Sequence, residues 1–478
     1  MNDRSSFLDV VVDRTLGNLR SLRTAWRDIA AQARGALARA PRPDLSREDT
    51  ERLREQLHEC LATRGGAVSA RARAADLGRT YLALNETGRE RFLMLLAREF
   101  DIDQAAVAAL GERLVRAAGE EERRQAEREL RTALEPPRIK LLTQFNALPE
   151  GVKFLVDMRA ELLALAAHEP VLAALELDLK ALLASWFDVG FLEITRITWD
   201  APAALLEKLI IYEAVHEIRS WADLKNRLEA DRRCFGYFHP RMPEEPLIFV
   251  EVALVRGMAD SIQSLLDETA PVGDPKAADT AIFYSISNCQ RGLAGISLGD
   301  FLIKRVVDNL AAELPHLKTY ATLSPVPGFR AWLDKRIPEE GEALLVPAER
   351  KAMAQLLPAD LAAQGLGDLL ARPRWYAEEP VAEALRAPLL RLAARYLLTE
   401  KTPRGRTLDT VAHFHLTNGA RMERLNWLAD LSPKGIQQSA GIMMNYLYRL
   451  DEIEANHEAY TGEGRVAASA GLLRLAKI

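Results

Sequence analysis

A serine and a histidine far apart in the chain are the residues best suited to acid–base chemistry. Ser324 lies in the run Leu-Ser-Pro-Val-Pro-Gly-Phe, where Pro325 and Pro327 fix a turn after a short strand predicted near 318–323. His415 lies in Val-Ala-His-Phe-His-Leu-Thr-Asn, and an imidazole with an ordinary pKa of about 6.5 exchanges a proton near neutral pH. Structural roles are the alternatives: a turn residue for the serine and a polar packing residue for the histidine.

A glycine-rich stretch is suited to holding an anionic ligand. Residues 281–287 mix apolar, aromatic and β-branched side chains, which predicts a largely buried strand. Gly292, Gly295 and Gly299 follow, and apolar residues at helical spacing over 298–310 then predict a helix. Backbone N–H groups at the start of such a helix attract a phosphate, so the pattern predicts a site for a phosphorylated ligand.

Length and composition exclude several classes of protein. A chain of 478 residues exceeds the usual single core, which predicts two or three domains. The net charge of −5 gives no reason to expect a nucleic-acid-binding surface. The three cysteines are widely spaced, which argues against a disulfide framework and a thiolate metal cluster. No apolar run reaches the roughly 18 residues of a membrane span. Charged residues near the N-terminus argue against a secretory signal, so we expect a cytoplasmic enzyme.

The predicted elements change in character along the chain. Residues 1–185 are rich in helix formers and are predicted to be wholly helical. The predicted breaks are Pro41–Pro43, Gly65–Gly66, Asn85–Gly88 and Pro136–Pro137. Further strands are predicted over 191–199, 234–238 and 246–254, and a short helix over 261–268. From residue 328 onward the chain is predicted to return to helix, with breaks near 338–341 and 403–406.

Several long motifs resemble malonyl-CoA decarboxylases. They are Phe-His-Pro-Arg-Met-Pro-Glu-Glu-Pro-Leu-Ile-Phe-Val-Glu-Val-Ala-Leu (238–254), Ala-Ile-Phe-Tyr-Ser-Ile-Ser (281–287), Gly-Ile-Ser-Leu-Gly-Asp-Phe-Leu-Ile-Lys-Arg-Val-Val (295–307), Leu-Ser-Pro-Val-Pro-Gly-Phe (323–329), Val-Ala-His-Phe-His-Leu-Thr-Asn-Gly-Ala (411–420) and Leu-Asn-Trp-Leu-Ala-Asp (425–430). The likeness extends back to Gly151 and covers about two thirds of the chain. The resemblance implies an α+β protein with an N-terminal all-helical domain (1–186), predicted to serve oligomerisation. A GNAT-like, acetyltransferase-fold catalytic domain with added C-terminal helices (187–478) would follow it.

The same resemblance implies a function and a set of site residues. The family converts malonyl-CoA to acetyl-CoA and carbon dioxide without a metal or organic cofactor, and it forms dimers and tetramers. Ser324 corresponds to its catalytic serine, described as proton acceptor, and His415 to its histidine, described as proton donor. The residues implied to bind CoA, within the glycine loop 292–300, are Ala294, Gly295, Ile296, Ser297, Leu298, Gly299 and Asp300. Ser285 and Ser287, near the end of the predicted strand, are candidates to line the acyl pocket, with packing as an equal alternative.

Two other functions remain open at this point. A CoA-dependent acyltransferase would share the fold class, since a fold does not fix a function. A catalytically inactive CoA-binding assembly protein would use the long helical part instead. Formation of acetyl-CoA from malonyl-CoA alone, without an acceptor amine, distinguishes the decarboxylase from the acyltransferase.

Overall fold

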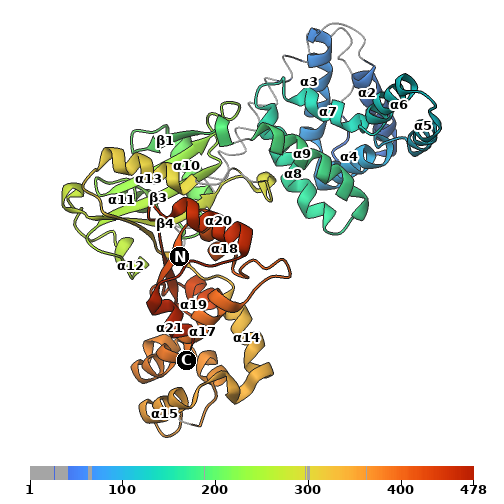
Figure 1. Ribbon diagram of the computed structural model, residues 1–478. Helices are drawn as coiled ribbons and strands as arrows, with labels where there is room; N and C mark the ends of the chain where they lie inside the picture. The colour runs from blue at the N-terminus through green and yellow to red at the C-terminus, as the bar shows by residue number, and fades with distance from the viewer. Residues whose placement is uncertain are drawn as a thin grey trace. The chain divides into compact units, whose positions relative to one another are not determined.

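The computed structural model describes Trp26, Ile29 and residues 41–62, 67–187, 189–296, 298, 302–361 and 363–477. The chain forms two compact units (Figure 1). The first comprises Met1–Glu193, Tyr237–Ile248 and Asn288–Leu298, and the second comprises Ile194–Gly236, Phe249–Ser287 and Gly299–Ile478. The predicted division into domains 1–186 and 187–478 stays a prediction.

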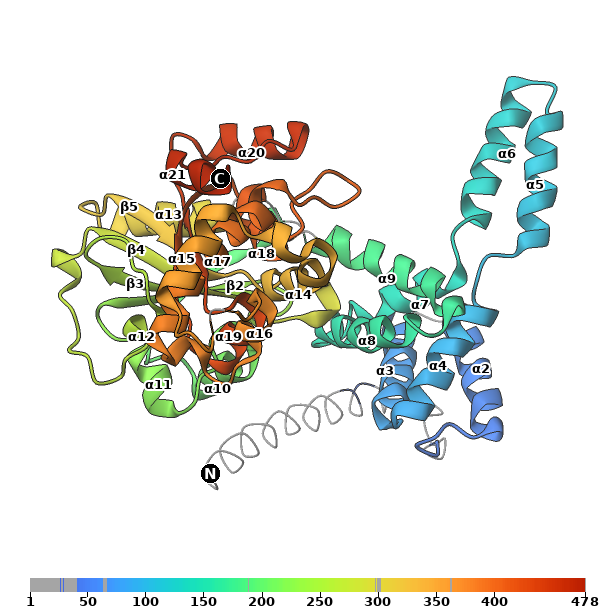
Figure 2. The same ribbon diagram turned by 90° about the horizontal axis from the view of Figure 1, so that it is seen from below.

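Within the first unit, the described residues between 41 and 187 form helices joined by turns, as the composition predicts. Its helices are α2 (Arg47–Leu61), α3 (Ala67–Ala83), α4 (Glu86–Glu99), α5 (Gln104–Arg116), α6 (Glu120–Ala133), α7 (Pro137–Phe145), α8 (Gly151–Ala166) and α9 (Ala173–Trp186). Side-chain caps mark several starts: Ser46 accepts from the N–H of Asp49, and Asn85 from that of Gly88. Figure 2 shows α5 and α6 side by side, and α5 buries none of its residues.

A mixed sheet of eight strands forms the core of the second unit. The strands are β1 (Glu193–Ile197), β2 (Arg232–Phe238), β3 (Ile248–Val255), β4 (Thr280–Asn288), β5 (Thr319–Thr322), β6 (Ser324–Pro325), β7 (Arg421–Asn426) and β8 (Met443–Leu447). Their order is β1-β2-β3-β4-β5-β8-β6, with β7 also paired to β8. β4 and β5 are parallel, whereas β8 is antiparallel to β5, β6 and β7. The α+β class predicted from the sequence is confirmed.

Helices surround this sheet and extend from it. They are α10 (Ala203–Tyr212), α11 (Trp221–Asn226), α12 (Ile262–Leu265), α13 (Leu302–Glu313), α14 (Phe329–Glu340), α15 (Pro347–Leu356), α16 (Leu366–Ala371), α17 (Glu379–Thr399), α18 (Thr410–Thr417), α19 (Pro433–Ser439), α20 (Ile453–Glu463) and α21 (Ala470–Ala476). Helices α14 to α17 pack together (Figure 1), and α18 packs on α20. None of the helices in the described part of the chain is long and apolar enough to span a bilayer.

The prediction of helix from residue 328 onward is wrong at β7 and β8. Strand β8 reads Met-Met-Asn-Tyr-Leu, and four of its five residues are buried, so it lacks the alternation of a half-exposed strand. Strand β7 reads Arg-Met-Glu-Arg-Leu-Asn, which contains good helix formers, and its pairing with β8 overrides that local preference.

The two faces of the central strands differ in chemistry. Alternate residues of a strand point to opposite faces. Ile282, Leu323 and Met443 join a buried apolar cluster on one face. The residues that follow them by one position therefore point to the other face, and these include Ser324 and Met444, which are register partners. This second face carries the candidate active site.

Candidate active site

Ser324 lies where β5 ends and β6 begins. The ladder between β4 and β5 pairs Phe283 with Thr322 and continues to a bond from the Leu323 N–H to the Phe283 carbonyl (2.9 Å). Ser324 then pairs with Met444 of β8 and is 6% exposed. Its Oγ donates to Thr322 Oγ1 at 2.9 Å. The hydroxyl therefore lies on a strand held by backbone pairing, as a rigid site requires.

His415 meets Ser324 from helix α18. Asp409 caps the start of this helix, and its Oδ1 accepts from the N–H of Ala412 at 2.9 Å. His415 is 2% exposed, and its Nε2 atom lies 2.9 Å from Ser324 Oγ. The structure thus brings together the two residues that the sequence analysis selected as catalytic candidates.

Two tyrosines, Tyr446 in β8 and Tyr448 just after it, complete the surroundings of the imidazole. The hydroxyl of Tyr448 lies 2.8 Å from His415 Nδ1. The ring of Tyr446 stacks on the imidazole with centroids 4.3 Å apart and an interplanar angle of 24°. From the sequence alone, which predicts helix here, packing in a helical core is the preferred interpretation for Tyr446 over a place in the cleft, and Tyr448 is not selected. Had this stretch been identified as a strand, its alternation would have placed Tyr446 and Tyr448 on the face of Met444.

The hydrogen-bond directions define the tautomer of His415. Thr322 Oγ1 accepts from the Tyr446 N–H at 3.1 Å and also from Ser324 Oγ. Because Ser324 Oγ donates its proton to the bond with Thr322, it is free to accept a hydrogen bond from His415 Nε2–H. The other nitrogen, Nδ1, then carries no proton and accepts from the Tyr448 hydroxyl. The proton on His415 therefore points to Ser324.

Burial keeps this imidazole neutral. Burial lowers the pKa of His415 to about 3. The same cause raises the pKa of the Tyr448 hydroxyl well above its usual value, so both groups are uncharged near neutral pH. A neutral imidazole with a proton on Nε2 donates a hydrogen bond without adding a positive charge.

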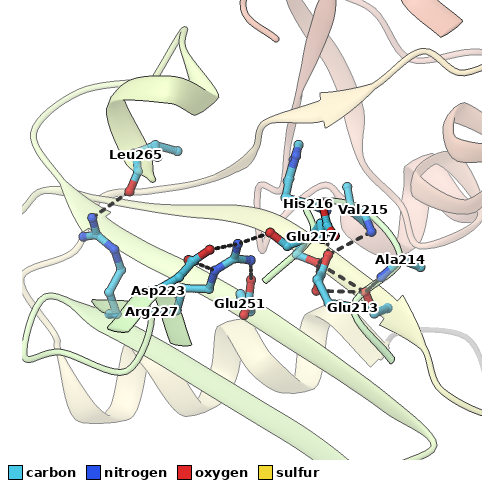
Figure 3. A network of polar contacts seen from close by, with 12 residues as sticks. Glu213, Ala214, Val215, His216, Glu217, Asp223, Arg227, Glu251 and Leu265 are labelled. Carbon is cyan, nitrogen blue, oxygen red and sulfur yellow. Dashed lines mark hydrogen bonds and ion pairs between the residues drawn. The ribbon is translucent and has the colours of Figure 1, made fainter. Parts of the chain in front are cut away.

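Ser285 and Ser287 bind a carboxylate that the sequence analysis did not select. Ser285 Oγ donates to both carboxylate oxygens of Glu213 at 2.8 Å, and Ser287 Oγ donates to one of them at 3.1 Å. The backbone N–H groups of Val215 and His216 donate to Glu213 Oε1 at 2.8 and 2.7 Å (Figure 3). Because both serine protons are directed to Glu213, either hydroxyl would face a ligand as an acceptor.

The segment after Glu213 is fixed at its far end by a buried arginine. Arg227 donates to the Glu217 carbonyl at 3.1 Å, to Asp223 Oδ1 at 2.8 Å and to Glu251 Oε2 at 3.1 Å (Figure 3). Burial raises the pKa of Glu251 to about 8, against the opposing effect of the Arg227 charge. Between these anchors His216 is buried, and its burial and the charges of Arg227 and Lys434 lower its pKa to about 3. No short sequence pattern indicates this network.

The first half of the glycine loop is anchored within the first unit. Arg159 of α8 donates to the carbonyls of Gly292 and Ala294, and it pairs with Glu176 at 2.6 Å. A Cβ atom on Gly292 would lie 1.8 Å from the Val156 carbonyl oxygen, so only glycine fits there.

The rest of the predicted CoA loop is described only in part. Gly295 has a φ of +71°, the Ile296 N–H bonds the Leu293 carbonyl at 3.0 Å, and Leu298 is buried. Ser297, Gly299 and Asp300 lie outside the described residues.

Comparison with known proteins identifies the family. The family model described as "Malonyl-CoA decarboxylase C-terminal domain" matches residues 190–477, and the one described as "Malonyl-CoA decarboxylase N-terminal domain" matches residues 100–187. The chain belongs to the malonyl-CoA decarboxylase family. The resemblance stated from the sequence is thereby confirmed, as is the prediction of a carboxy-lyase.

Relatives from animals and bacteria extend the match over most of the chain. "Malonyl-CoA decarboxylase, mitochondrial" of Anser anser anser is 39% identical over 421 residues, covering 84% of this chain and 83% of the relative. The protein of the same name from Rattus norvegicus is 38% identical, with 85% of each chain covered. Because these relatives are named as mitochondrial, the cytoplasmic location expected from the sequence stays a prediction.

Solved structures of bacterial malonyl-CoA decarboxylases resemble this fold. The structure from Rhodopseudomonas palustris has a TM-score of 0.81 and 44% identity, and it covers 89% of this chain and 99% of its own. That from Agrobacterium vitis has a TM-score of 0.80 and 43% identity, and it covers 89% and 100%.

Proposed function

We propose that this chain converts malonyl-CoA to acetyl-CoA and carbon dioxide, without a metal or organic cofactor, and that Ser324 and His415 manage the proton. The observation that carries the proposal is the 2.9 Å hydrogen bond between Ser324 Oγ and His415 Nε2 in a chain of this family. Loss of carbon dioxide leaves an electron pair delocalised onto the thioester oxygen, and the carbon must then receive one proton.

The hydrogen-bond chain offers a route for that proton. His415 Nε2–H points to Ser324 Oγ, so in the proposed relay the Ser324 Oγ proton moves to the carbanion while His415, as proton donor, passes its Nε2 proton to Ser324 Oγ. The Tyr448 hydroxyl proton moves to His415 Nδ1 in the same step, so the negative charge ends on the Tyr448 oxygen and the imidazole stays neutral. Tyr448 donates to His415 Nδ1 and keeps the imidazole in the tautomer that can donate. A proton from solvent finally replaces the one that the hydrogen-bond chain has given to the carbanion. One proton enters for each carbon dioxide lost, so the reaction is balanced.

Binding of CoA positions the acyl group for this step. Energy from the nucleotide part of a substrate can be used to orient its reacting end. We propose that residues 294–300 contact CoA, which the glycine content and the family membership support. If so, Gly295→Val should raise KM for malonyl-CoA, because a β-branched residue is strained at a φ of +71°.

A direct assay tests the decarboxylase proposal. The purified full chain is incubated with malonyl-CoA alone, and acetyl-CoA is measured by chromatography. Ser324→Ala and His415→Asn should each reduce kcat by at least ~100-fold. His316→Gln changes an exposed histidine that bonds the Pro275 carbonyl, and it serves as the control. Product that forms only when an amine acceptor is added would favour the acyltransferase instead.

The oligomeric state is a separate proposal. We infer a homo-oligomer, a dimer or a tetramer, from the family to which the chain belongs. Light scattering of the purified chain measures its mass directly, and a monomeric mass at assay concentrations would contradict this proposal.

A further inference from the structure

A cation-rich hairpin joins α17 to α18 in the second unit. It reads Lys-Thr-Pro-Arg-Gly-Arg-Thr over Lys401–Thr407, and its ends form a β-bridge (Figure 2). The Thr402 N–H bonds the Arg406 carbonyl at 2.8 Å, and the Gly405 N–H bonds the Thr402 carbonyl at 2.9 Å. Proline in the turn and a Gly405 φ of +76° fit this tight conformation. The hairpin is therefore an ordered element.

The hairpin carries three positive side chains, Lys401, Arg404 and Arg406. Among the residues that the structure describes, none forms an ion pair with Lys401, Arg404 or Arg406. The acidic residue just before the hairpin, Glu400, pairs with Arg336 at 3.3 Å. Beside the hairpin tip, Glu463 pairs with Arg465 at 3.1 Å. These two carboxylates are thus already paired with other cations.

Lys401 differs from the two arginines because its charged atom is buried. Its Nζ atom is buried and has no hydrogen-bond partner among the described residues. Burial lowers its pKa, since an ammonium removed from water loses hydration. A partly buried charge also acts over a longer distance than one in water. The hairpin therefore combines two exposed arginines with a buried lysine nitrogen that has no hydrogen-bond partner among the described residues.

The hairpin is connected to the helix that carries His415. The Thr407 N–H donates to the Tyr460 hydroxyl at 3.2 Å, and the same hydroxyl lies 2.8 Å from His413 Nδ1 on α18. Burial and the nearby charge of Arg406 together lower the pKa of His413. Arg406 thus lies close enough to α18 to act on one of its side chains, and α18 begins three residues after the hairpin ends.

We propose that the hairpin Lys401–Thr407 binds a phosphate group of the CoA nucleotide, with Arg404 and Arg406 as direct contacts and Lys401 strengthening the positive potential. This inference rests on the proposed function, because it takes a CoA thioester as the ligand. Guanidinium groups suit phosphate oxygens through paired hydrogen bonds. A phosphate would also supply the negative charge that the described residues around the hairpin do not.

Binding and kinetics of one double variant test the proposal. Arg404→Ala/Arg406→Ala should raise both KM for malonyl-CoA and the calorimetric Kd for CoA by about tenfold, with kcat nearly unchanged. Both arginines are exposed, so the fold should be retained. Lys401→Met, which keeps the apolar length of the side chain, should weaken CoA binding less. Arg386→Ala removes an exposed α17 cation that pairs with Glu383 and should change neither constant.

Dephospho-CoA identifies which phosphate is bound. If the 3′-phosphate is the ligand, wild type should bind dephospho-CoA as weakly as the double variant binds CoA. The double variant should then bind dephospho-CoA with nearly the same Kd as wild type does. If the pyrophosphate is the ligand, the variant should weaken both ligands equally. A CoA Kd for the double variant within about twofold of wild type would overturn the proposal. Calorimetry measures CoA binding without turnover, so it separates the two proposals. A wild-type chain that binds CoA but forms no acetyl-CoA would refute the decarboxylase proposal and leave the phosphate-binding proposal standing.

Discussion

The Nδ1 atom of His415 lies 2.8 Å from the hydroxyl of Tyr448, so a tyrosine orients the imidazole where other Ser–His sites commonly use a carboxylate. A carboxylate would stabilise an imidazolium, whereas a neutral hydroxyl with a raised pKa does not. This partner suits an imidazole that works without becoming charged.

Tyr448→Phe tests this role. The variant removes the hydrogen bond that fixes the His415 tautomer, so kcat should fall about tenfold while KM for malonyl-CoA stays near its wild-type value. Steady-state kinetics give both constants. Tyr376→Phe changes a tyrosine whose ring packs against Trp375, and it serves as the control. Equal kcat values for Tyr448→Phe and wild type would show that Tyr448 only packs against the site.

The rate should be insensitive to pH where a typical histidine titrates. Burial lowers the pKa of His415 to about 3, so the imidazole stays neutral from pH 5 to pH 8, and kcat should show no inflection near 6.5. A pH series with saturating substrate checks this expectation. A decline in kcat centred near pH 6.5 would contradict this prediction if it persisted in variants in which each of the other histidines is replaced. It would then mean that His415 is solvated and titrates normally.

Stability should decrease as the solution is acidified. His216 and His415 both have folded pKa values of about 3. Because the unfolded chain binds these protons first, near pH 6.5, stability is complete above that pH and falls between 6.5 and 3. Each histidine lowers the folding equilibrium constant about tenfold per pH unit in this range. Urea midpoints at several pH values, compared between wild type and His216→Gln, should show a smaller slope for the variant. Equal slopes would contradict this prediction for His216.

Glu213 should contribute strongly to the stability of the second unit. Glu213→Ala leaves the buried hydroxyls of Ser285 and Ser287 and two backbone N–H groups without their acceptor. The free energy of unfolding should fall by roughly 2–3 kcal/mol, the usual cost of unsatisfied buried donors. The variant Ser285→Ala/Ser287→Ala removes the two hydroxyl donors, so no buried serine hydroxyl is left without an acceptor. Its free energy of unfolding should fall by less than that of Glu213→Ala. A double-mutant cycle by urea unfolding compares the two changes, and additive effects would contradict the proposed coupling.

The sequence predicts those parts of the structure in which local pattern and environment agree. Strand β4 and helix α13 have clear composition and spacing, and Ser324 and His415 were found through long motifs. Strand β8 is buried on both faces, so its sequence carries no period of two. Helical packing was therefore preferred for Tyr446, and Tyr448 was missed. Glu213 was missed for another reason: its partners Ser285 and Ser287 are more than 70 residues away, and no local pattern records such a contact.

Strand β8 also sets the order in which the site can be completed during synthesis. It pairs with β5, β6 and β7, and the strand with the residue that follows it supplies the stacking and hydrogen-bonding partners of His415. A ribosome that has just translated Ser324 or even His415 carries a nascent chain without this strand. Such a chain cannot hold the serine and the imidazole in their final geometry, so catalytic competence should arise only after β8 and Tyr448 have emerged.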